Sequence, residues 1–406
     1  MSKHLKGLLS CKRVLLLQGP MGNFFSKFSQ WLVQHKIDCL KLDFNGGDAF
    51  FSKNIKNTFD YTDTLENFEN WLTHFIKEYN IDAIVCFGDC RFYHVIAKNV
   101  SKQCQIKFYA FEEGYIRPNY ITFEQDGVNF YSNFNDAFTV GYLDQSKSVI
   151  QPAVAVNNRF SLMTLSAILY YWFWVMRSSK YPNYQHHRQI APRLELYYWW
   201  RSAYRRLRNR IFEKRRFKLF LRQYSKQYFI FSLQVHNDSQ ILTHSHLKSV
   251  ELYIEKVIES FGQYANKNQH LVLKHHPMDR GYKDYSKLIH EYMMKFNLEG
   301  RIHYFCDIHF PSLLKHSLGM VTVNSTTGLQ ALFHGIPVKT IGYAIYNLPG
   351  LTNQYPLQKF WLEPGEVDMA YFYYFRQKLI DYSQLNGSFY GKSPWMSETK
   401  SIEDEK

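Results

Sequence analysis

Short apolar runs and amphipathic stretches alternate along the first part of the chain, with glycine-rich turns between them. Compact apolar runs predict buried strands, whereas apolar positions three and four residues apart predict helices packed on one face. The predicted strands lie at 14–18, 39–44, 83–87 and 107–111, and the predicted helices at 24–35, 64–79 and 93–102. Alternation of this kind is typical of a mostly parallel sheet.

The same pattern returns from residue 228. It predicts strands at 228–233, 270–274, 320–324 and 337–341, and helices at 247–264, 285–296 and 327–334. The fold class that follows is α/β, with two successive doubly wound, Rossmann-type halves that face a cleft. Ligands of such sheets bind outside the carboxyl ends of the strands, so the informative motifs are expected there.

The stretch between the two halves breaks the pattern. It holds the uncharged run 160–176, clusters of tyrosine and tryptophan, and a strongly basic block. We therefore expect a helical insertion. The predicted domains are an N-terminal acceptor and catalytic domain (1–157), the basic, aromatic insertion (158–224), a nucleotide-binding domain (225–365), and a C-terminal segment that is helical to residue 382 and then loose (366–406).

Composition narrows the class of protein. A chain of 406 residues exceeds the usual size of one core, and 46% hydrophobic against 21% charged residues excludes a disordered chain. The six cysteines form no CxxC pair and no zinc-type spacing with histidine, which fits a reducing cytoplasm. The apolar run 14–17 is too short for a signal peptide, and no clear DxD metal motif occurs. We expect no export signal and no metal cofactor.

The net charge of +14 is concentrated in one place, because ten Lys/Arg and a single acid lie between Arg201 and Arg222. Basic residues beside aromatic ones also occur in nucleic-acid proteins, but no recognised nucleic-acid fold surrounds them here. The run 160–176 is shorter than the roughly 20 residues that span a bilayer. We therefore predict peripheral attachment to an anionic inner-membrane surface through Arg205, Arg206, Arg208 and Arg210.

A run of small hydroxyl residues follows the predicted strand at 320–324 and begins a helix. The set comprises Asn324, Ser325, Thr326, Thr327 and Gly328. One interpretation is a simple helix cap. The other is an anion site, because backbone N–H groups, hydroxyl donors and the helix dipole all favour a phosphate.

Lys274, His275 and His276 end another predicted strand, and Pro277 stops its pairing. A cation and two imidazoles there can converge with the hydroxyl-rich turn on one phosphate. Gln234 follows the first strand of the same half and is a further nucleotide candidate. The turn that contains Asp238, with His244 and Ser245 beyond it, is either a polar cap or a contact to donor sugar or acceptor.

Glu112 and Glu113 are the acid/base or nucleophile candidates of the first half. Adjacent side chains on extended backbone point to opposite sides, so one carboxylate can face the site while the other packs inward, against Arg117 or a backbone amide. Phe111 and Gly114 beside them favour partial burial over a solvated turn. A shielded carboxylate can act as a base or attack an anomeric carbon.

Several of these motifs, in this order, resemble the capsule polysaccharide biosynthesis/export family. The resemblance runs from about residue 13 to 350 and is interrupted by the insertion. It rests on Asn45-Gly46-Gly47-Asp48, Phe87-Gly88-Asp89-Cys90-Arg91, Phe111 to Pro118, Gln234 to Ile241 with His244-Ser245, Lys274 to Pro277, and Asn324 to Gly328.

The resemblance implies a GT-B fold and retaining transfer of β-Kdo from CMP-Kdo to a (lyso)phosphatidylglycerol-type lipid, the start of an oligo-Kdo linker, in the company of other capsule proteins. The His-Pro and Ser-Thr-Thr motifs would then bind CMP. Glu113 falls where related Kdo transferases carry aspartate, at the nucleophile position. Asn45, Gly46, Asp89, Arg91 and Arg117 would contact donor sugar or acceptor.

Two alternatives stay open at this point. The first is a non-enzymatic export factor that binds capsule polymer through the basic surface. The second is a GT-B transferase with another donor, such as CMP-sialic acid or a UDP-sugar, because the phosphate motifs identify a nucleotide better than they identify its base.

Overall fold

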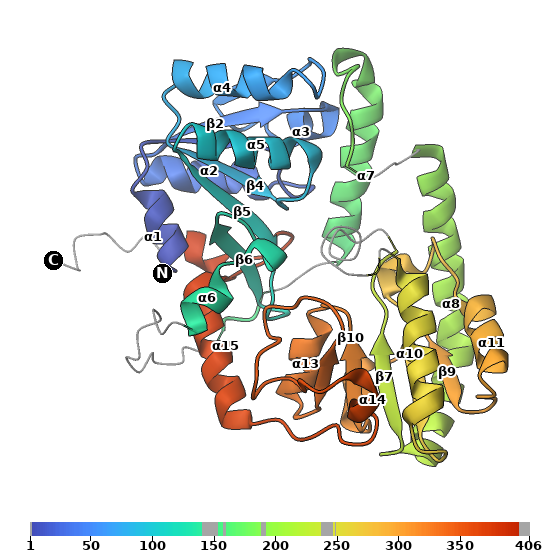
Figure 1. Cartoon of the computed structure of the whole chain (residues 1–406). Coiled ribbons are helices and arrows are strands. Elements are labelled where there is room, and N and C mark those ends of the chain that lie inside the picture. The colour runs from blue at the N-terminus through green and yellow to red at the C-terminus, as the bar shows by residue number, and fades with distance from the viewer. Residues whose placement is uncertain are drawn as a thin grey trace. The chain divides into compact units, whose positions relative to one another are not determined.

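The structure is a computed structural model of the chain that describes residues 2–139, 153–156, 160–187, 192–236, 247 and 249–397. It divides into two compact units (Figure 1). Unit 1 comprises Met1–Gln189 and Gln377–Lys406, and unit 2 comprises Ile190–Arg376. Each unit contains its own sheet.

The sheet of unit 1 has seven strands in the order β12-β6-β5-β4-β1-β2-β3. Neighbouring strands from β1 to β5 are parallel, while β6 pairs antiparallel with both β5 and β12. The strands are β1 (Arg13–Leu16), β2 (Asp38–Asp43), β3 (Asn57–Asp60), β4 (Ala83–Phe87), β5 (Lys107–Glu113), β6 (Tyr120–Gln125) and β12 (Gln384–Asn386).

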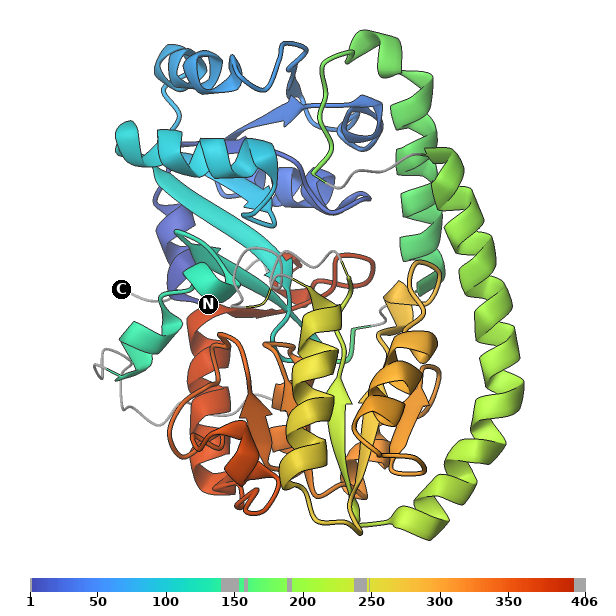
Figure 2. The same cartoon turned by 45° about the vertical axis from the view of Figure 1, so that its right-hand side comes forward.

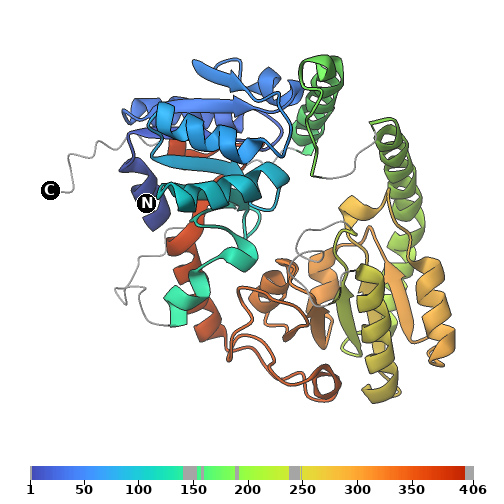
Figure 3. The ribbon, with the colours of Figure 1, turned by 45° about the horizontal axis from the view of Figure 1, so that its top comes forward.

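Helices cover both faces of this sheet because alternate strand residues enter two separate cores. Val14 and Leu16 pack with α1 (Lys3–Leu9) and α2 (Phe24–Gln34), whereas Leu15 and Leu17 pack with α4 (Phe68–Glu78) and α5 (Phe92–Gln103). Unit 1 also contains α3 (Gly46–Phe51), α6 (Phe134–Thr139) and α7 (Phe160–Met176). Helix α7 lies alongside α3, at one end of the sheet (Figure 3).

The sheet of unit 2 is fully parallel, in the order β11-β10-β7-β8-β9. Its strands are β7 (Tyr228–Ser232), β8 (His270–Lys274), β9 (Ile302–Phe305), β10 (Gly319–Thr322) and β11 (Val338–Thr340). One face packs on α10 (Val250–Tyr264), α11 (Ser286–Lys295) and α14 (Leu357–Phe360).

The long helix α8 (Pro192–Tyr224) runs along unit 2 beside β9 (Figure 2). Its Phe217 and Phe220 rings pack against Phe305 of β9, with centroids 5.8 and 5.6 Å away. Helices α12 (Phe310–Lys315) and α13 (Thr327–Phe333) also belong to unit 2, and α15 (Met369–Ser383) leads back to unit 1.

The predicted α/β class, with two mostly parallel sheets, is confirmed. The insertion predicted at 158–224 differs in detail, because its two helices belong to different units. The C-terminal segment also differs from the loose tail that we predicted. Residues 384–386 form β12, and Phe389 is buried against Phe24, with ring centroids 4.8 Å apart.

Candidate active site

Polar side chains gather where the parallel strands of unit 1 end. Gln18 follows β1, Asn45 and Asp48 follow β2, Asp89 follows β4, and Glu112 and Glu113 end β5. Because parallel strands point the same way, these groups lie along one edge of the sheet, the edge where ligands of α/β sheets bind. They separate into a buried network and a pair of adjacent glutamates.

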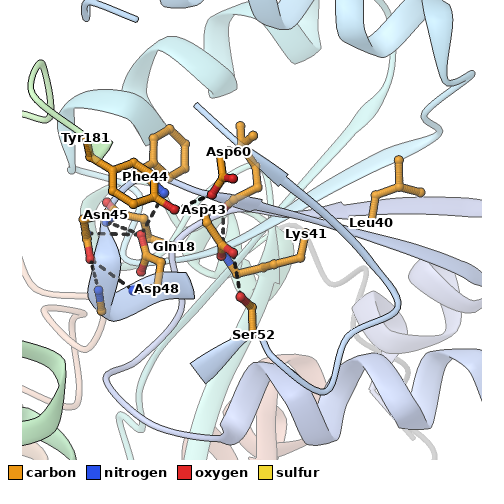
Figure 4. Close-up of polar contacts among 12 residues, drawn as sticks. Gln18, Leu40, Lys41, Asp43, Phe44, Asn45, Asp48, Ser52, Asp60 and Tyr181 are labelled. Carbon is orange, nitrogen blue, oxygen red and sulfur yellow. Dashed lines mark hydrogen bonds and ion pairs between the residues drawn. The ribbon is translucent and has the colours of Figure 1, made fainter. Parts of the chain in front are cut away.

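The buried network fixes the start of α3. Asn45 is fully buried, and its Oδ1 accepts hydrogen bonds from the N–H groups of Gly47 (2.8 Å) and Asp48 (3.0 Å). The Asp48 carboxylate accepts from Gln18 Nε2 (3.1 Å), Asn45 Nδ2 (3.2 Å) and the Tyr170 hydroxyl of α7 (3.2 Å). Figure 4 shows Gln18, Asn45 and Asp48 turned toward one another. The network therefore joins two strand ends to a helix that lies far away in sequence.

The two glycines of this motif make room for α7. A Cβ atom on Gly46 would lie 2.1 Å from the Phe173 carbonyl oxygen, and one on Gly47 would lie 2.7 Å from the Tyr170 ring. A Cβ atom does not approach other heavy atoms that closely, so any larger residue would push α7 away. The structure thus uses Asn45 and Gly46 to seat α7, a different role from the sugar or acceptor contact predicted from sequence.

A second group of polar contacts supports the same region (Figure 4). The buried Lys41 ammonium lies 2.9 Å from Asp43 Oδ1, and Ser52 donates to the other oxygen of Asp43 at 2.5 Å. Asp60, at the end of β3, accepts hydrogen bonds from Lys180 and Tyr181 in the turn after α7. The C-terminal half of α7 and the turn after it are therefore anchored to carboxyl ends of strands.

Glu112 and Glu113 occupy different environments on β5. Glu112 Oε1 accepts the N–H of Glu113 at 2.9 Å, and its carboxyl group lies near Asp89 and Arg91. Burial raises the pKa of Glu112 to about 7, and the charges of Glu113 and Asp89 act in the same direction. Glu113 instead lies near the hydroxyl of Tyr390 in the C-terminal segment. Burial and the negative charge of Glu113 both raise the pKa of Tyr390. The two carboxyl groups therefore have different neighbours.

Three other predicted residues surround this pair in different ways. Asp89 is buried and accepts from the Val128 N–H at 3.0 Å, so it organises the loop after β6. The Arg91 guanidinium lies 5.3 Å from the centre of the Phe87 ring. Arg117 is exposed, and its Nε donates to the Gly114 carbonyl at 3.3 Å. Arg91 is therefore the cation placed beside Glu112.

In unit 2, hydroxyl groups from two neighbouring strands meet. Thr327 Oγ1 lies 2.9 Å from Ser325 Oγ and 3.2 Å from Ser232 Oγ, which ends β7. Gln234 Nε2 donates to Asn324 Oδ1 at 2.8 Å. Helix α13 begins at Thr327, after Thr326, and has only seven residues. Anion binding there would depend on these hydroxyls and nearby N–H groups more than on a long helix dipole.

Gly328 allows another close approach. A Cβ atom at this position would lie 2.2 Å from the Tyr346 hydroxyl, which donates to the Ser325 carbonyl. Tyr346 is almost completely buried, so it holds the hydroxyl-rich turn in place from below. Sequence reasoning missed Tyr346, because nothing local links it to a turn some twenty residues earlier.

Lys274, which ends β8, and His276, which follows it, have different hydrogen-bond partners. The buried Lys274 ammonium donates to the carbonyls of His275 (2.8 Å) and Cys306 (2.6 Å), so it ties two strand ends together. His276 Nδ1 accepts the N–H of Met278 at 3.2 Å, in the turn that begins at Pro277. A neutral His276 therefore carries its proton on Nε2, as a phosphate ligand would. The charge that we assigned to Lys274 at the phosphate is instead used within the fold.

Asp279 is a further residue that sequence reasoning missed. It is completely buried, its Oδ1 lies 2.5 Å from His236 Nδ1, and its Oδ2 accepts the His236 N–H at 3.3 Å. The pair fixes the orientation of an imidazole at the end of β7. The only sequence signal was an acid two residues after Pro277. The predicted contacts Asp238, His244 and Ser245 lie outside the described residues.

The four arginines predicted to face a membrane also separate. Arg205 is buried and donates to the carbonyls of Arg280 and Lys283, each at 2.8 Å, and to Asp284. The prediction that Arg205 faces a membrane is therefore wrong, because this buried arginine holds α8 onto unit 2. Arg206, Arg208 and Arg210 are exposed.

Two negative findings apply to the described ranges alone. Within them, no three histidine, cysteine or acidic residues are grouped as they would be around a metal ion. Likewise, no helix in the described part of the chain has the length and apolar character to cross a bilayer.

Comparisons with known proteins agree with the motifs. A family model described as capsule polysaccharide biosynthesis protein matches residues 82–390. The capsule polysaccharide modification protein LipB of Neisseria meningitidis serogroup B is 38% identical over 398 residues, which are 97% of this chain and 95% of that protein. The capsule polysaccharide export protein KpsS of Escherichia coli is 37% identical over 385 residues, which are 94% of this chain and 98% of that protein. Among solved structures, Thermosulfurimonas dismutans KpsC, beta Kdo 2,7 transferase, is 14% identical with a TM-score of 0.41, covering 90% of this chain and 99% of that one.

Proposed function

The chain belongs to the capsule polysaccharide biosynthesis protein family, and on that premise we propose that it is a retaining glycosyltransferase of capsule assembly. The observation that carries the proposal is the pair Glu112 and Glu113 at the carboxyl edge of a parallel sheet, where burial brings the pKa of Glu112 to about 7. A capsule-binding adaptor has no need of two adjacent carboxyl groups at the strand ends where ligands of α/β sheets bind.

The proposed donor is CMP-Kdo, and the proposed acceptor is a (lyso)phosphatidylglycerol-type lipid. In the first step the Glu113 carboxylate attacks the anomeric carbon and the bond to the CMP oxygen breaks. In the second step the acceptor hydroxyl attacks the same carbon, releases Glu113 and gives up its proton. Two displacements restore the original configuration at the sugar.

Each carboxyl group has a separate part in this scheme. Glu113 is the nucleophile, because resemblance places it at the nucleophile position. Glu112 is the group that takes the proton of the acceptor, since its pKa of about 7 suits proton transfer near neutral pH. Arg91, next to Glu112, supplies positive charge for the carboxylate of the sugar itself.

The nucleotide would be held by unit 2. The hydroxyls of Ser325 and Thr327 and the Nε2–H of His276 all suit phosphate oxygens. Gln234 and Asn324 form a hydrogen-bonded pair beside this turn, which suits a ribose or base contact. Such donors would stabilise a departing nucleotide phosphate by hydrogen bonds, and no metal ion is proposed.

The proposed site of action is the inner face of the inner membrane, where the lipid acceptor would be available. Other capsule biosynthesis and export proteins are proposed partners there. KpsS of Escherichia coli is named for export, so the competing function is a polymer-binding export factor without catalysis.

Mass spectrometry of products decides between these functions. Purified protein incubated with CMP-Kdo and lysophosphatidylglycerol should yield the acceptor with one added Kdo, together with CMP. Parallel incubations with CMP-sialic acid and UDP-sugars test the alternative donors. No product with any donor, from protein that still binds capsule polymer, would favour the export factor.

A further inference from the structure

Helix α8 presents two faces of opposite character in unit 2. Hydrogen bonds hold its inner face to the rest of the unit. Arg205 donates to the carbonyls of Arg280 and Lys283. Asn209 Nδ2 donates to Asp307 Oδ2 at 2.9 Å, and Glu213 accepts the Asp307 N–H at 2.7 Å. Gly281 belongs to the same contact, since a Cβ atom there would lie 2.3 Å from the Tyr198 carbonyl. The rotation of α8 about its own axis is therefore fixed.

The opposite face is apolar and exposed over the first half of the helix. Its side chains recur every three or four residues, which places them in one line along the helix. Residues 196 and 211 are about 22 Å apart at 1.5 Å per residue. We call this line the α8 ridge, and its members with their exposed fractions are Leu196 (67%), Trp200 (65%), Tyr204 (57%), Leu207 (62%) and Ile211 (63%).

The same line continues as cations. Lys214, Lys218 and Arg222 follow Ile211 at the same spacing and are exposed. Exposed arginines at 208, 210 and 215 flank the line. The two acids in the described part of α8 are bonded to unit 2 and do not lie on the line: Glu213 accepts the Asp307 N–H, and Glu195 accepts a hydrogen bond from the Tyr282 hydroxyl at 2.6 Å.

We propose that α8 is an interfacial helix that lies along an anionic phospholipid surface, with the α8 ridge entering the boundary between headgroups and acyl chains. Lys214, Lys218 and Arg222 then contact lipid phosphates at the end of the same line. A helix with bulky exposed aliphatic and aromatic side chains on one line, and with exposed cations that continue and flank that line, matches that chemistry. Charge complementarity favours a lipid surface over a second copy, since two copies of this face would bring like charges together.

The inference goes beyond the proposed function, because it names a surface and an orientation that no catalytic residue requires. It also changes which residues matter. Arg205 serves the fold, whereas Trp200, Leu207 and Ile211 carry the attachment.

Vesicle co-sedimentation tests the proposal with the full chain. The wild-type protein should bind vesicles that contain phosphatidylglycerol far better than pure phosphatidylcholine vesicles. At 1 M salt, where screening acts within about 3 Å, part of the binding should remain because apolar burial is not screened.

Two variants separate the apolar contribution to vesicle binding from the electrostatic one. The triple change Leu196→Gln, Leu207→Gln and Ile211→Gln should weaken binding at least about tenfold at both salt concentrations, since each side chain loses its apolar burial. The triple change Lys214→Gln, Lys218→Gln and Arg222→Gln should weaken binding at low salt and reduce its dependence on salt. A matched control changes three exposed apolar residues elsewhere in unit 2, Leu252→Gln, Tyr264→Gln and Met294→Gln, and should bind as wild type does.

Light scattering and circular dichroism complete the test. All three variants should keep the wild-type helical signal, because the changed side chains are exposed. Wild-type vesicle affinity in the ridge variant would overturn the proposal. So would a ridge variant that converts a wild-type dimer to monomers without changing vesicle affinity, since the face would then belong to an interface between copies.

Discussion

Two glutamates that are neighbours on β5 have carboxyl groups in different surroundings, and a single substitution distinguishes their parts. Glu113→Gln keeps the size of the side chain but removes the charge needed to attack an anomeric carbon. We expect loss of transfer with CMP affinity nearly unchanged, because the proposed nucleotide residues are in unit 2. Product mass spectrometry and calorimetric titration with CMP measure the two properties. Wild-type turnover in this variant would remove Glu113 from the mechanism.

The raised pKa of Glu112 makes a prediction about stability. Burial brings its pKa from 4.5 to about 7 in the folded protein, so between these values the folded state holds a proton that the unfolded chain has released. The folded state binds more protons there, and the free energy of unfolding therefore falls as the pH rises from about 4.5 to 7.

Glu112→Gln should remove that decline. Urea unfolding at pH 5 and pH 7 should show the variant gaining stability relative to wild type as the pH rises. Glu66→Gln, at an exposed carboxylate of the same unit, is the control and should follow the wild-type trend. A Glu112 variant that parallels wild type across this range would show that the carboxyl group is not desolvated.

The proposed nucleotide site predicts a different pattern. His276→Ala and Ser325→Ala should each weaken CMP binding by about 1–3 kcal/mol if each removes a charge-assisted hydrogen bond. Lys274→Ala should instead lower the melting temperature, because its ammonium joins the carbonyls of His275 and Cys306. Titration calorimetry and thermal unfolding separate the outcomes, and unchanged CMP affinity in both of the first two variants would move the donor site elsewhere.

At the scale of single elements, glycines decide where the inserted helices sit. Gly46→Ala would place a methyl group 2.1 Å from the Phe173 carbonyl, so α7 must shift. We expect a loss of about 1–3 kcal/mol in the free energy of unfolding, the usual cost of overpacking. Gly262→Ala in α10 is the control, because the nearest atom to its methyl group, at 3.2 Å, belongs to the flexible Leu298 side chain and a helix gains from alanine.

Strand prediction worked for compact apolar runs. It failed where a segment forms a strand only because a distant strand pairs with it. The core strands β4 and β8 were predicted with the bounds that the structure has. β12 was missed because it pairs with β6 across more than 250 residues, as between Ile121 and Leu385, and no local pattern encodes such a pairing. Likewise, the motif that begins at Asn45 has the composition of a ligand-binding turn. Its glycines are explained by the close packing of α7 against Gly46 and Gly47, which the local sequence does not reveal.

At the scale of the whole molecule, unit 1 is built from both ends of the chain. Gln384 accepts the N–H of Tyr115 at 2.9 Å and donates to Thr122 at 3.0 Å, and Phe389 packs on Phe24. A chain that stops after Ser383 should therefore lose the folded state of unit 1, measured as dye binding to exposed apolar surface and loss of the thermal transition. A chain that stops after Ser397 keeps all these contacts and should unfold as the full chain does.

The shared composition of unit 1 has a consequence during protein synthesis. A ribosome adds roughly 5–20 residues per second, so about 13 to 50 seconds separate the appearance of β6 from that of β12. All of unit 2 is translated in that interval, while the β6 edge and the apolar surface of Phe24 have no partner from the C-terminal segment. The nascent chain thus carries an open sheet edge for most of its elongation, which makes it a substrate for chaperones that bind extended apolar segments. The unit that leaves the ribosome first is the last to be finished.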